Sequence, residues 1–177
     1  TGLEVDRVIG FRPAPSALFY HPNGAEILHL AGAAVVVASL TDPHQQRLLH
    51  AHGMDVTCLA LSSSGRLAAS GEAGGSGGSV GSGSGGGVSI VDEFSDIVVW
   101  DVAARRVLYR LSEHDGGVSA VAFSHDERLL LTTGGGKLAC WDMSTGWAVA
   151  VADCAPTPVA AAWGGFVRDV KRRDTDK

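Results

Sequence analysis

Short apolar runs, broken by glycine, serine and aspartate, follow one another along most of the chain. Two of them, DVTCLALS at residues 55–62 and GVSAVAFS at residues 117–124, have the length of strands, and each leads into a polar turn. Five more runs have the same character: RLAASG, DIVVWD, RVLYRL, RLLLTTG and KLACWD. No segment keeps an apolar period of 3.6 residues, so the pattern predicts an all-β chain with almost no helix.

One set of residue types occurs twice along the chain: a histidine, a hydroxyl residue and a Trp-Asp pair. The first copy comprises His52, Ser70, Trp100 and Asp101. The second copy comprises His114, Thr132, Trp141 and Asp142, with Thr133 as the alternative to Thr132. The histidines and the hydroxyl residues repeat after 62 positions, whereas the Trp-Asp pairs repeat after 41. The difference of 21 positions predicts an insertion ahead of the first Trp-Asp pair.

The predicted insertion coincides with a stretch that is rich in glycine and serine. Residues 74–87 contain nine glycines, four serines and one valine. This composition is typical of a flexible surface loop, so we assign residues 73–95 to a loop insertion. Without the insertion the repeat is about 41 residues long, and Ala38 takes the tryptophan position in an earlier copy.

A period of about 40–45 residues that ends in Trp-Asp is typical of propeller blades with four strands each. On these residues the chain resembles the WD-repeat family, and the resemblance implies a WD-repeat β-propeller. We assign residues 1–163 to a partial propeller and residues 164–177 to a charged, disordered tail. The expected blades cover residues 8–49, 52–111 and 114–151, and residues 158–165 (PVAAAWGG) are expected to form the first strand of a fourth. Propellers close with about 4–8 blades, so we expect the N-terminal part of a longer protein or an incomplete gene model.

The resemblance also implies roles for the repeated residues. In WD-repeat proteins the histidine, the hydroxyl residue and the tryptophan form a buried chain of hydrogen bonds that ends at an aspartate in a turn. Such a chain is physically sound because a buried imidazole, hydroxyl or indole N–H needs a partner. Here Phe94 and Gly135 occupy the aspartate position, and the first blade has His29 at the hydroxyl position. We therefore expect structural roles for the repeated residues, in a polar chain that is incomplete in every blade.

The order of motifs is more specific than a general WD signature. VIGF at residues 8–11 and HPNG at residues 21–24 precede HAHGMDVTCLALSSSGRLAASGE, a loop and DIVVWD. Together these motifs resemble a group of WD-repeat proteins of motile cilia and flagella. The resemblance implies a scaffold inside axonemal doublet microtubules, with tubulin and other axonemal proteins as partners. Microtubule-associated proteins of the echinoderm type share a similar blade with a loop and are a competing resemblance.

Composition narrows the class of partner. The net charge is −5 and the pI about 5.7, which gives no support for the basic face of a nucleic-acid binder. No apolar run reaches the roughly 18 residues of a membrane span. The three cysteines form no CxxC pair, so we expect no disulfide scaffold and a reducing compartment, which fits the cytoplasm. The resemblance implies the cytoskeleton of the cilium within it.

Motifs that could carry chemistry are weak. Residues 81–86 match G-x-G-x-x-G, but a β-like run follows where a dinucleotide site needs a helix. His44, His50 and His52 have no cysteine or carboxylate at metal-ligand spacing. The serines at 62–64 lack the G-x-S-x-G elbow of a nucleophile. We therefore expect no catalytic residue, no metal, no cofactor and no small-molecule substrate.

The leading hypothesis for function is a non-enzymatic protein-interaction scaffold of the ciliary axoneme. An adaptor of another cytoplasmic complex, such as a cytoskeletal or ubiquitin-ligase scaffold, is the alternative because a fold does not fix a function. An enzyme that uses the central channel of the propeller is a third hypothesis. We expect contacts on loops and turns at the rims, with residues 74–95 and the turn at residues 103–106 as candidates.

Overall fold

The computed structural model describes residues 7–14, 16–42, 44–74 and 94–164. In these residues it contains twelve β-strands and no helix, which confirms the prediction of an all-β chain. No helix that could cross a membrane occurs in the same residues. Most of the predicted insertion and almost all of the predicted charged tail lie outside the described residues.

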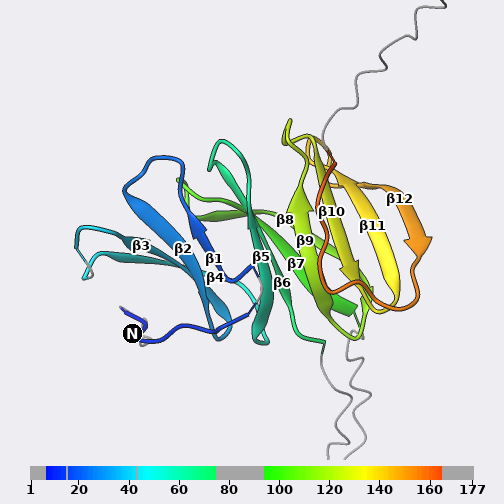
Figure 1. Cartoon of the computed structure of the whole chain (residues 1–177), viewed down its shortest axis with the longest axis horizontal. Helices are drawn as coiled ribbons and strands as arrows, with labels where there is room; N and C mark the ends of the chain where they lie inside the picture. The colour runs from blue at the N-terminus through cyan, green and yellow to red at the C-terminus, as the bar shows by residue number, and fades with distance from the viewer. Residues whose placement is uncertain (1–6, 15, 43, 75–93, 165–177) are drawn as a thin grey trace, which may run out of the picture.

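The twelve strands form three antiparallel sheets of four strands, which lie side by side as three blades (Figure 1). In each sheet the strands follow one another in chain order, so neighbours are joined by short turns except where the insertion intervenes. The first blade consists of β1 (Leu18–Tyr20), β2 (Glu26–Ala31), β3 (Ala34–Ser39) and β4 (Gln46–His50). The second consists of β5 (Val56–Leu61), β6 (Leu67–Glu72), β7 (Phe94–Asp101) and β8 (Arg106–Asp115). The third consists of β9 (Val118–Phe123), β10 (Leu129–Gly134), β11 (Lys137–Asp142) and β12 (Ala148–Asp153).

The hydrophobic core lies between the blades rather than inside any one of them. One cluster joins the first and second blades and the other joins the second and third. The first contains Leu28, Leu30, Val35 and Val37 from the first blade and Ala68, Val98 and Trp100 from the second. The other contains Ala69, Ile97 and Val99 from the second blade and Val121, Leu130, Ala139 and Trp141 from the third. The second blade therefore buries both of its faces, as the near-continuous apolar run IVVW on β7 requires.

Residues 158–164 differ from the expectation, because they form no strand. They nevertheless lie beside β9: Ser119 Oγ donates to the Pro158 carbonyl at 2.7 Å, and Trp163 Nε1 donates to the Ala122 carbonyl at 2.9 Å. Thr57 Oγ1 makes the same kind of contact one blade earlier, 2.5 Å from the Val118 carbonyl. The segment thus occupies the place of an innermost strand, but no strand in the described part of the chain pairs with it to complete a ladder.

Gly71 tests how closely the second and third blades approach. A Cβ atom added there would lie 2.5 Å from Val118 Cβ and 3.0 Å from Cys58 Sγ, both in the buried cluster between these blades. Gly71→Ala should therefore push β6 away from β9 and lower the free energy of unfolding by about 1–3 kcal/mol. Urea denaturation followed by tryptophan fluorescence measures the change. Gly53→Ala is the control, since a Cβ atom at Gly53 meets nothing within 4 Å, and equal midpoints for the two variants would contradict the tight contact.

Candidate functional site

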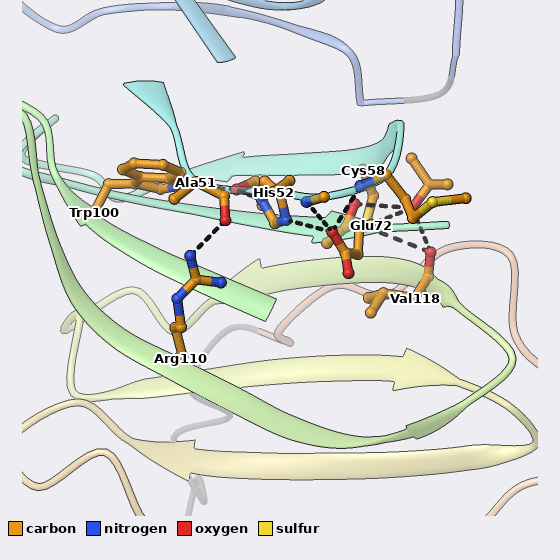
Figure 2. A network of polar contacts seen from close by, with 12 residues as sticks. Ala51, His52, Cys58, Glu72, Trp100, Arg110 and Val118 are labelled. Carbon is orange, nitrogen blue, oxygen red and sulfur yellow. Dashed lines mark hydrogen bonds and ion pairs between the residues drawn. The ribbon is translucent and has the colours of Figure 1, made fainter. Parts of the chain in front are cut away.

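The second blade contains a buried chain of polar side chains (Figure 2). Trp100 on β7 donates its indole N–H to Ser70 Oγ on β6 at 2.7 Å. Ser70 Oγ lies 2.6 Å from Nε2 of His52, which stands in the loop before β5, and His52 Nδ1 lies 3.2 Å from Glu72 Oε2. Trp100 is 2% exposed, Ser70 0% and His52 4%, so water is excluded from most of the chain.

The partners set the direction of these hydrogen bonds. An indole N–H can only donate, so Ser70 Oγ accepts from Trp100 and keeps its own proton for His52. A carboxylate can only accept, so His52 Nδ1 carries a proton and donates it to Glu72. Every polar atom in the chain thus has a complementary partner when the imidazole is neutral, and the tautomer follows from the partners.

Glu72 is a member of this chain that sequence reasoning missed. Its Oε2 atom also accepts the backbone N–H groups of Gly53 at 3.1 Å and Met54 at 3.3 Å. It therefore fastens the end of β6 to the loop before β5, immediately ahead of the predicted insertion. The expectation of an incomplete polar chain in every blade is wrong for the second blade, because the carboxylate comes two residues after Ser70 rather than six before Trp100.

A second buried chain joins two strands of the third blade to His114 on β8 of the second blade, and it ends differently. Trp141 Nε1 donates to Thr132 Oγ1 at 2.9 Å, and Thr132 Oγ1 lies 2.8 Å from His114 Nε2. His114 Nδ1 donates to the Gly134 carbonyl at 3.0 Å, so a backbone oxygen takes the place of the carboxylate. Between the two candidate threonines, Thr132 makes these contacts, while Thr133 Oγ1 lies 2.9 Å from Ser119 Oγ.

Among the described residues of the first blade there is no such polar chain. Strand register places His29 opposite Val36 and Ala38 opposite Ile27, which are the positions of the hydroxyl residue and the tryptophan in the other blades. The histidine position is occupied by Phe11, whose ring packs edge-on against His29 with the ring centroids 6.1 Å apart. Sequence reasoning overlooked Phe11, although it precedes His29 by the same 18 residues that separate His52 from Ser70.

The two aspartates of the Trp-Asp pairs lie outside the buried chains. Asp101 Oδ1 accepts the backbone N–H of Ala104 at 2.9 Å, and Asp142 Oδ1 accepts the backbone N–H of Ser144 at 2.7 Å. Hydrogen bonds of this kind stabilise a turn after the strand. The aspartates thus close the turns that lead into β8 and β12.

The geometry of Ser70, His52 and Glu72 formally matches a Ser–His–carboxylate triad. Ser70 is fully buried, however, and its oxygen already accepts the Trp100 N–H, so a substrate carbonyl cannot reach it. Cys58 offers no alternative nucleophile, because burial raises the pKa of its thiol to about 11 and keeps it protonated. In the described residues no group of three His, Cys, Asp or Glu side chains could hold a metal ion. The buried chains are therefore suited to holding strands together rather than to catalysis.

A groove of about 420 Å³ runs along the innermost strands. Phe19, Leu61 and Phe123 line it from three different blades, and Trp163 closes one side. His125 is its only titratable lining residue, so the acidic and histidine groups that an enzyme in the central channel would need do not converge there. At the outer rim, the turn at residues 103–106 is exposed as expected, whereas residues 75–93 lie outside the described residues.

The contribution of Glu72 can be measured by removing its carboxylate. Glu72→Ala removes the carboxylate oxygen that accepts from His52 Nδ1 and from two backbone N–H groups, so the free energy of unfolding should fall by about 2–3 kcal/mol. Glu113→Ala is the matched control, since Glu113 makes a partly exposed ion pair with Lys137 at 3.7 Å, which contributes about 0–1 kcal/mol. Chemical denaturation of both variants tests this, and equal losses would argue against a special role for Glu72.

His114, buried on β8 against the third blade, should make stability depend on pH. Burial lowers the pKa of His114, which outweighs the Gly134 hydrogen bond and the nearby carboxylates that raise it. In the unfolded chain the pKa of this histidine is about 6.5, so below that pH the unfolded chain binds a proton more readily than the folded chain does. Stability from this residue is complete above about pH 6.5 and declines as the pH falls through that value. In urea titrations at several pH values, the His114→Gln variant should be less stable than the wild type, but its stability should fall less as the pH decreases. An unchanged pH profile would contradict the assignment of this decline to His114.

Comparison with known proteins agrees with this geometry. The family described as WD domain, G-beta repeat matches residues 43–80 and 105–142. Each match begins near the outermost strand of one blade and continues into the inner strands of the next, so the sequence repeat is offset from the sheets. Among solved structures, the RRP9 WD40 repeats and U3-55K each superpose with a TM-score of 0.67 at 18% identity, over 87% of this chain and 43% and 44% of theirs.

Three curated relatives are similar over most of the chain. Cilia- and flagella-associated protein 52 of Chlamydomonas reinhardtii is 33% identical over 156 residues, which cover 86% of this chain and 23% of that protein. The Homo sapiens protein of the same name is 33% identical over 80% of this chain and 21% of its own length. Centriole proteome protein 16 of Chlamydomonas reinhardtii is 35% identical over 88% of this chain and 8% of its own length.

The chain thus spans less than a quarter of the length of these relatives. The expected resemblance to a ciliary group of WD-repeat proteins is confirmed, since curated relatives of this chain carry the name cilia- and flagella-associated protein 52. With repeats that match in sequence and sheets that match in fold, the chain contains WD repeats that fold as blades of an incomplete β-propeller.

Proposed function

We propose that this chain is part of a non-enzymatic protein-interaction scaffold of motile cilia and flagella, acting at the axoneme. The observation that carries the proposal is the 33% identity to cilia- and flagella-associated protein 52 over 86% of the chain. The similarity to centriole proteome protein 16 supports the same part of the cell. More specifically, we propose that the protein lies in the lumen of doublet microtubules and stabilises them.

The proposed partners are tubulin and other axonemal proteins, rather than nucleic acid, membranes or small molecules. Such partners need a rigid surface of protein size, which the stacked blades provide. An adaptor of another cytoplasmic complex is the alternative, because the propeller fold suits it equally well.

Contacts between turns of neighbouring blades support binding of a protein partner through a rigid surface. His21 Nε2 lies 3.1 Å from the Gly65 carbonyl, so the β1–β2 turn contacts the β5–β6 turn. Ser63 Oγ donates to the His125 carbonyl at 3.0 Å, and Ser64 Oγ donates to Glu127 Oε2 at 2.9 Å, so that turn contacts the β9–β10 turn in its place. Three turns from three blades are thus held in one fixed arrangement. A surface that is already ordered binds without a further loss of conformational entropy.

Glu127 has a central place in this rim. Partial burial raises the pKa of its carboxyl, but hydrogen bonds from the Ser64 backbone and hydroxyl groups outweigh burial and hold the pKa below its usual value. Glu127 is therefore ionised at neutral pH and accepts two hydrogen bonds across the boundary between two blades. We infer that the rim formed by these turns is a rigid contact surface for a protein partner.

The test is localisation and extraction in a motile ciliated cell. The tagged protein should enter the axoneme and remain with the doublet microtubules after detergent and high salt, because a contact of many side chains resists screening. Arg66→Glu, exposed in the β5–β6 turn of this rim, should reduce retention, whereas Lys137→Glu, at the opposite ends of the strands, should not. An even cytosolic distribution with no axonemal signal would refute the ciliary proposal and leave the adaptor as the better one.

A further inference from the structure

The outermost strand of the third blade, β12, is unlike the outermost strands of the other two blades. All six of its residues are exposed, and no charged residue occurs between Trp147 and Ala152. Trp147 is 76% exposed, Val149 57% and Val151 46%. In the same place, β4 carries Arg47 and β8 carries Arg106 and Arg110.

The outer edge of β12 is open to a further strand. The third sheet has the order β12-β11-β10-β9, so β12 pairs with β11 on one side and has no strand on the other in the described part of the chain. Figure 1 shows this strand at the outer margin of the blade. An edge of this kind presents unpaired N–H and C=O groups, and proteins usually protect it with charged side chains. β4 and β8 carry such charges within the strand, whereas the one charged residue of β12 is Asp153, at its C-terminal end.

Stacking of blades leaves this edge open. The blades contact one another through the faces of their sheets, as the two buried clusters demonstrate. Val151 lies opposite Ala139, which packs toward the second blade, so its side chain is on that face of the sheet and yet remains 46% exposed. Another blade stacked against the opposite face would cover neither Val151 nor the outer edge.

The sequence of the strand indicates what can bind to it. Residues 148–152 read Ala-Val-Ala-Val-Ala, which is the same in both directions. If a second copy of β12 pairs antiparallel and is centred on Ala150, then Ala150 lies opposite itself and Val149 lies opposite Val151. Asp153 comes opposite Trp147 rather than another aspartate, so no like charges meet. A strand that matches itself in this way forms a two-fold contact, in which Val149 of each copy meets Val151 of the other and Ala150 meets Ala150.

We propose that β12 is a homodimerisation edge, on which two copies of this chain join their third sheets across a two-fold axis at Ala150. The occupant is a second copy because the palindromic stretch at residues 148–152, which carries no charge, complements itself. The register with β11 shifts beside Val149, so the unbroken ladder covers only residues 150–153. So short an edge falls below the roughly 1,200 Å² of a stable interface, and the dimer is weak and depends on concentration.

Sedimentation velocity over a wide range of protein concentration tests the proposal. The mass of the wild-type chain should rise from 18.2 kDa toward twice that value as concentration increases. Ala150→Lys places two lysines face to face on the axis and should raise the dissociation constant at least about tenfold. Ala150→Glu should do the same, and an equimolar mixture of the two variants should associate again because lysine then meets glutamate.

Two controls keep the result specific to β12. Val107→Lys changes an exposed valine on β8 and should leave association as in the wild type. Near-ultraviolet circular dichroism reports whether each variant keeps its tryptophan packing, and Val151→Lys replaces Ala150→Lys if that variant is misfolded. A wild-type chain that stays monomeric at every concentration would overturn the proposal. So would lysine variants that associate like the wild type, or a mixture that does not recover, since association would then use another surface.

Discussion

Packing of one sheet on the next is the interaction on which the rest of this structure depends. None of the three sheets has a core of its own, because the buried side chains lie in two clusters between blades. Close approach is needed for this burial, and Gly71 supplies it where β6 faces Val118. The second blade is covered on both faces, and the first and third blades each bury one face against it. The turns that join the strands inherit their fixed positions from this stacking.

The buried polar chains add specificity to a contact that is mainly apolar. An indole, a hydroxyl and an imidazole are placed so that each donor meets an acceptor. The histidine stands in the loop before β5 in one chain and on β8 of the neighbouring blade in the other. The three blades solve the same problem differently. Glu72 ends the chain in the second blade, the Gly134 carbonyl ends it in the third, and the first blade replaces it with the Phe11–His29 ring contact.

A rigid stack of this kind suits a scaffold. Among the described residues, buried polar groups such as Ser70 and Trp100 form hydrogen bonds with each other. Turns and strand edges are the parts that can contact other molecules. Two different surfaces result: a rim where Ser64 and Glu127 connect neighbouring turns, and an outer edge at β12 whose one charged residue is Asp153 at its end. The rim suits a partner that forms hydrogen bonds with polar groups in fixed positions, whereas the edge of β12 suits pairing with another strand.

The sequence alone determined the all-β class, the repeat and the alignment of Ser70 with Thr132, because alternation within strands and spacing between motifs are local properties. It also placed His29 and Ala38 in register with the later blades, as strand pairing shows. Only the tertiary structure decided that Glu72 serves His52, that Phe11 packs on His29 and that Thr132 rather than Thr133 joins Trp141. It also decided that residues 158–164 lie beside β9 without forming a strand. These outcomes depend on which groups meet across loops and blades, and a pattern of residue types along a chain does not contain those distances.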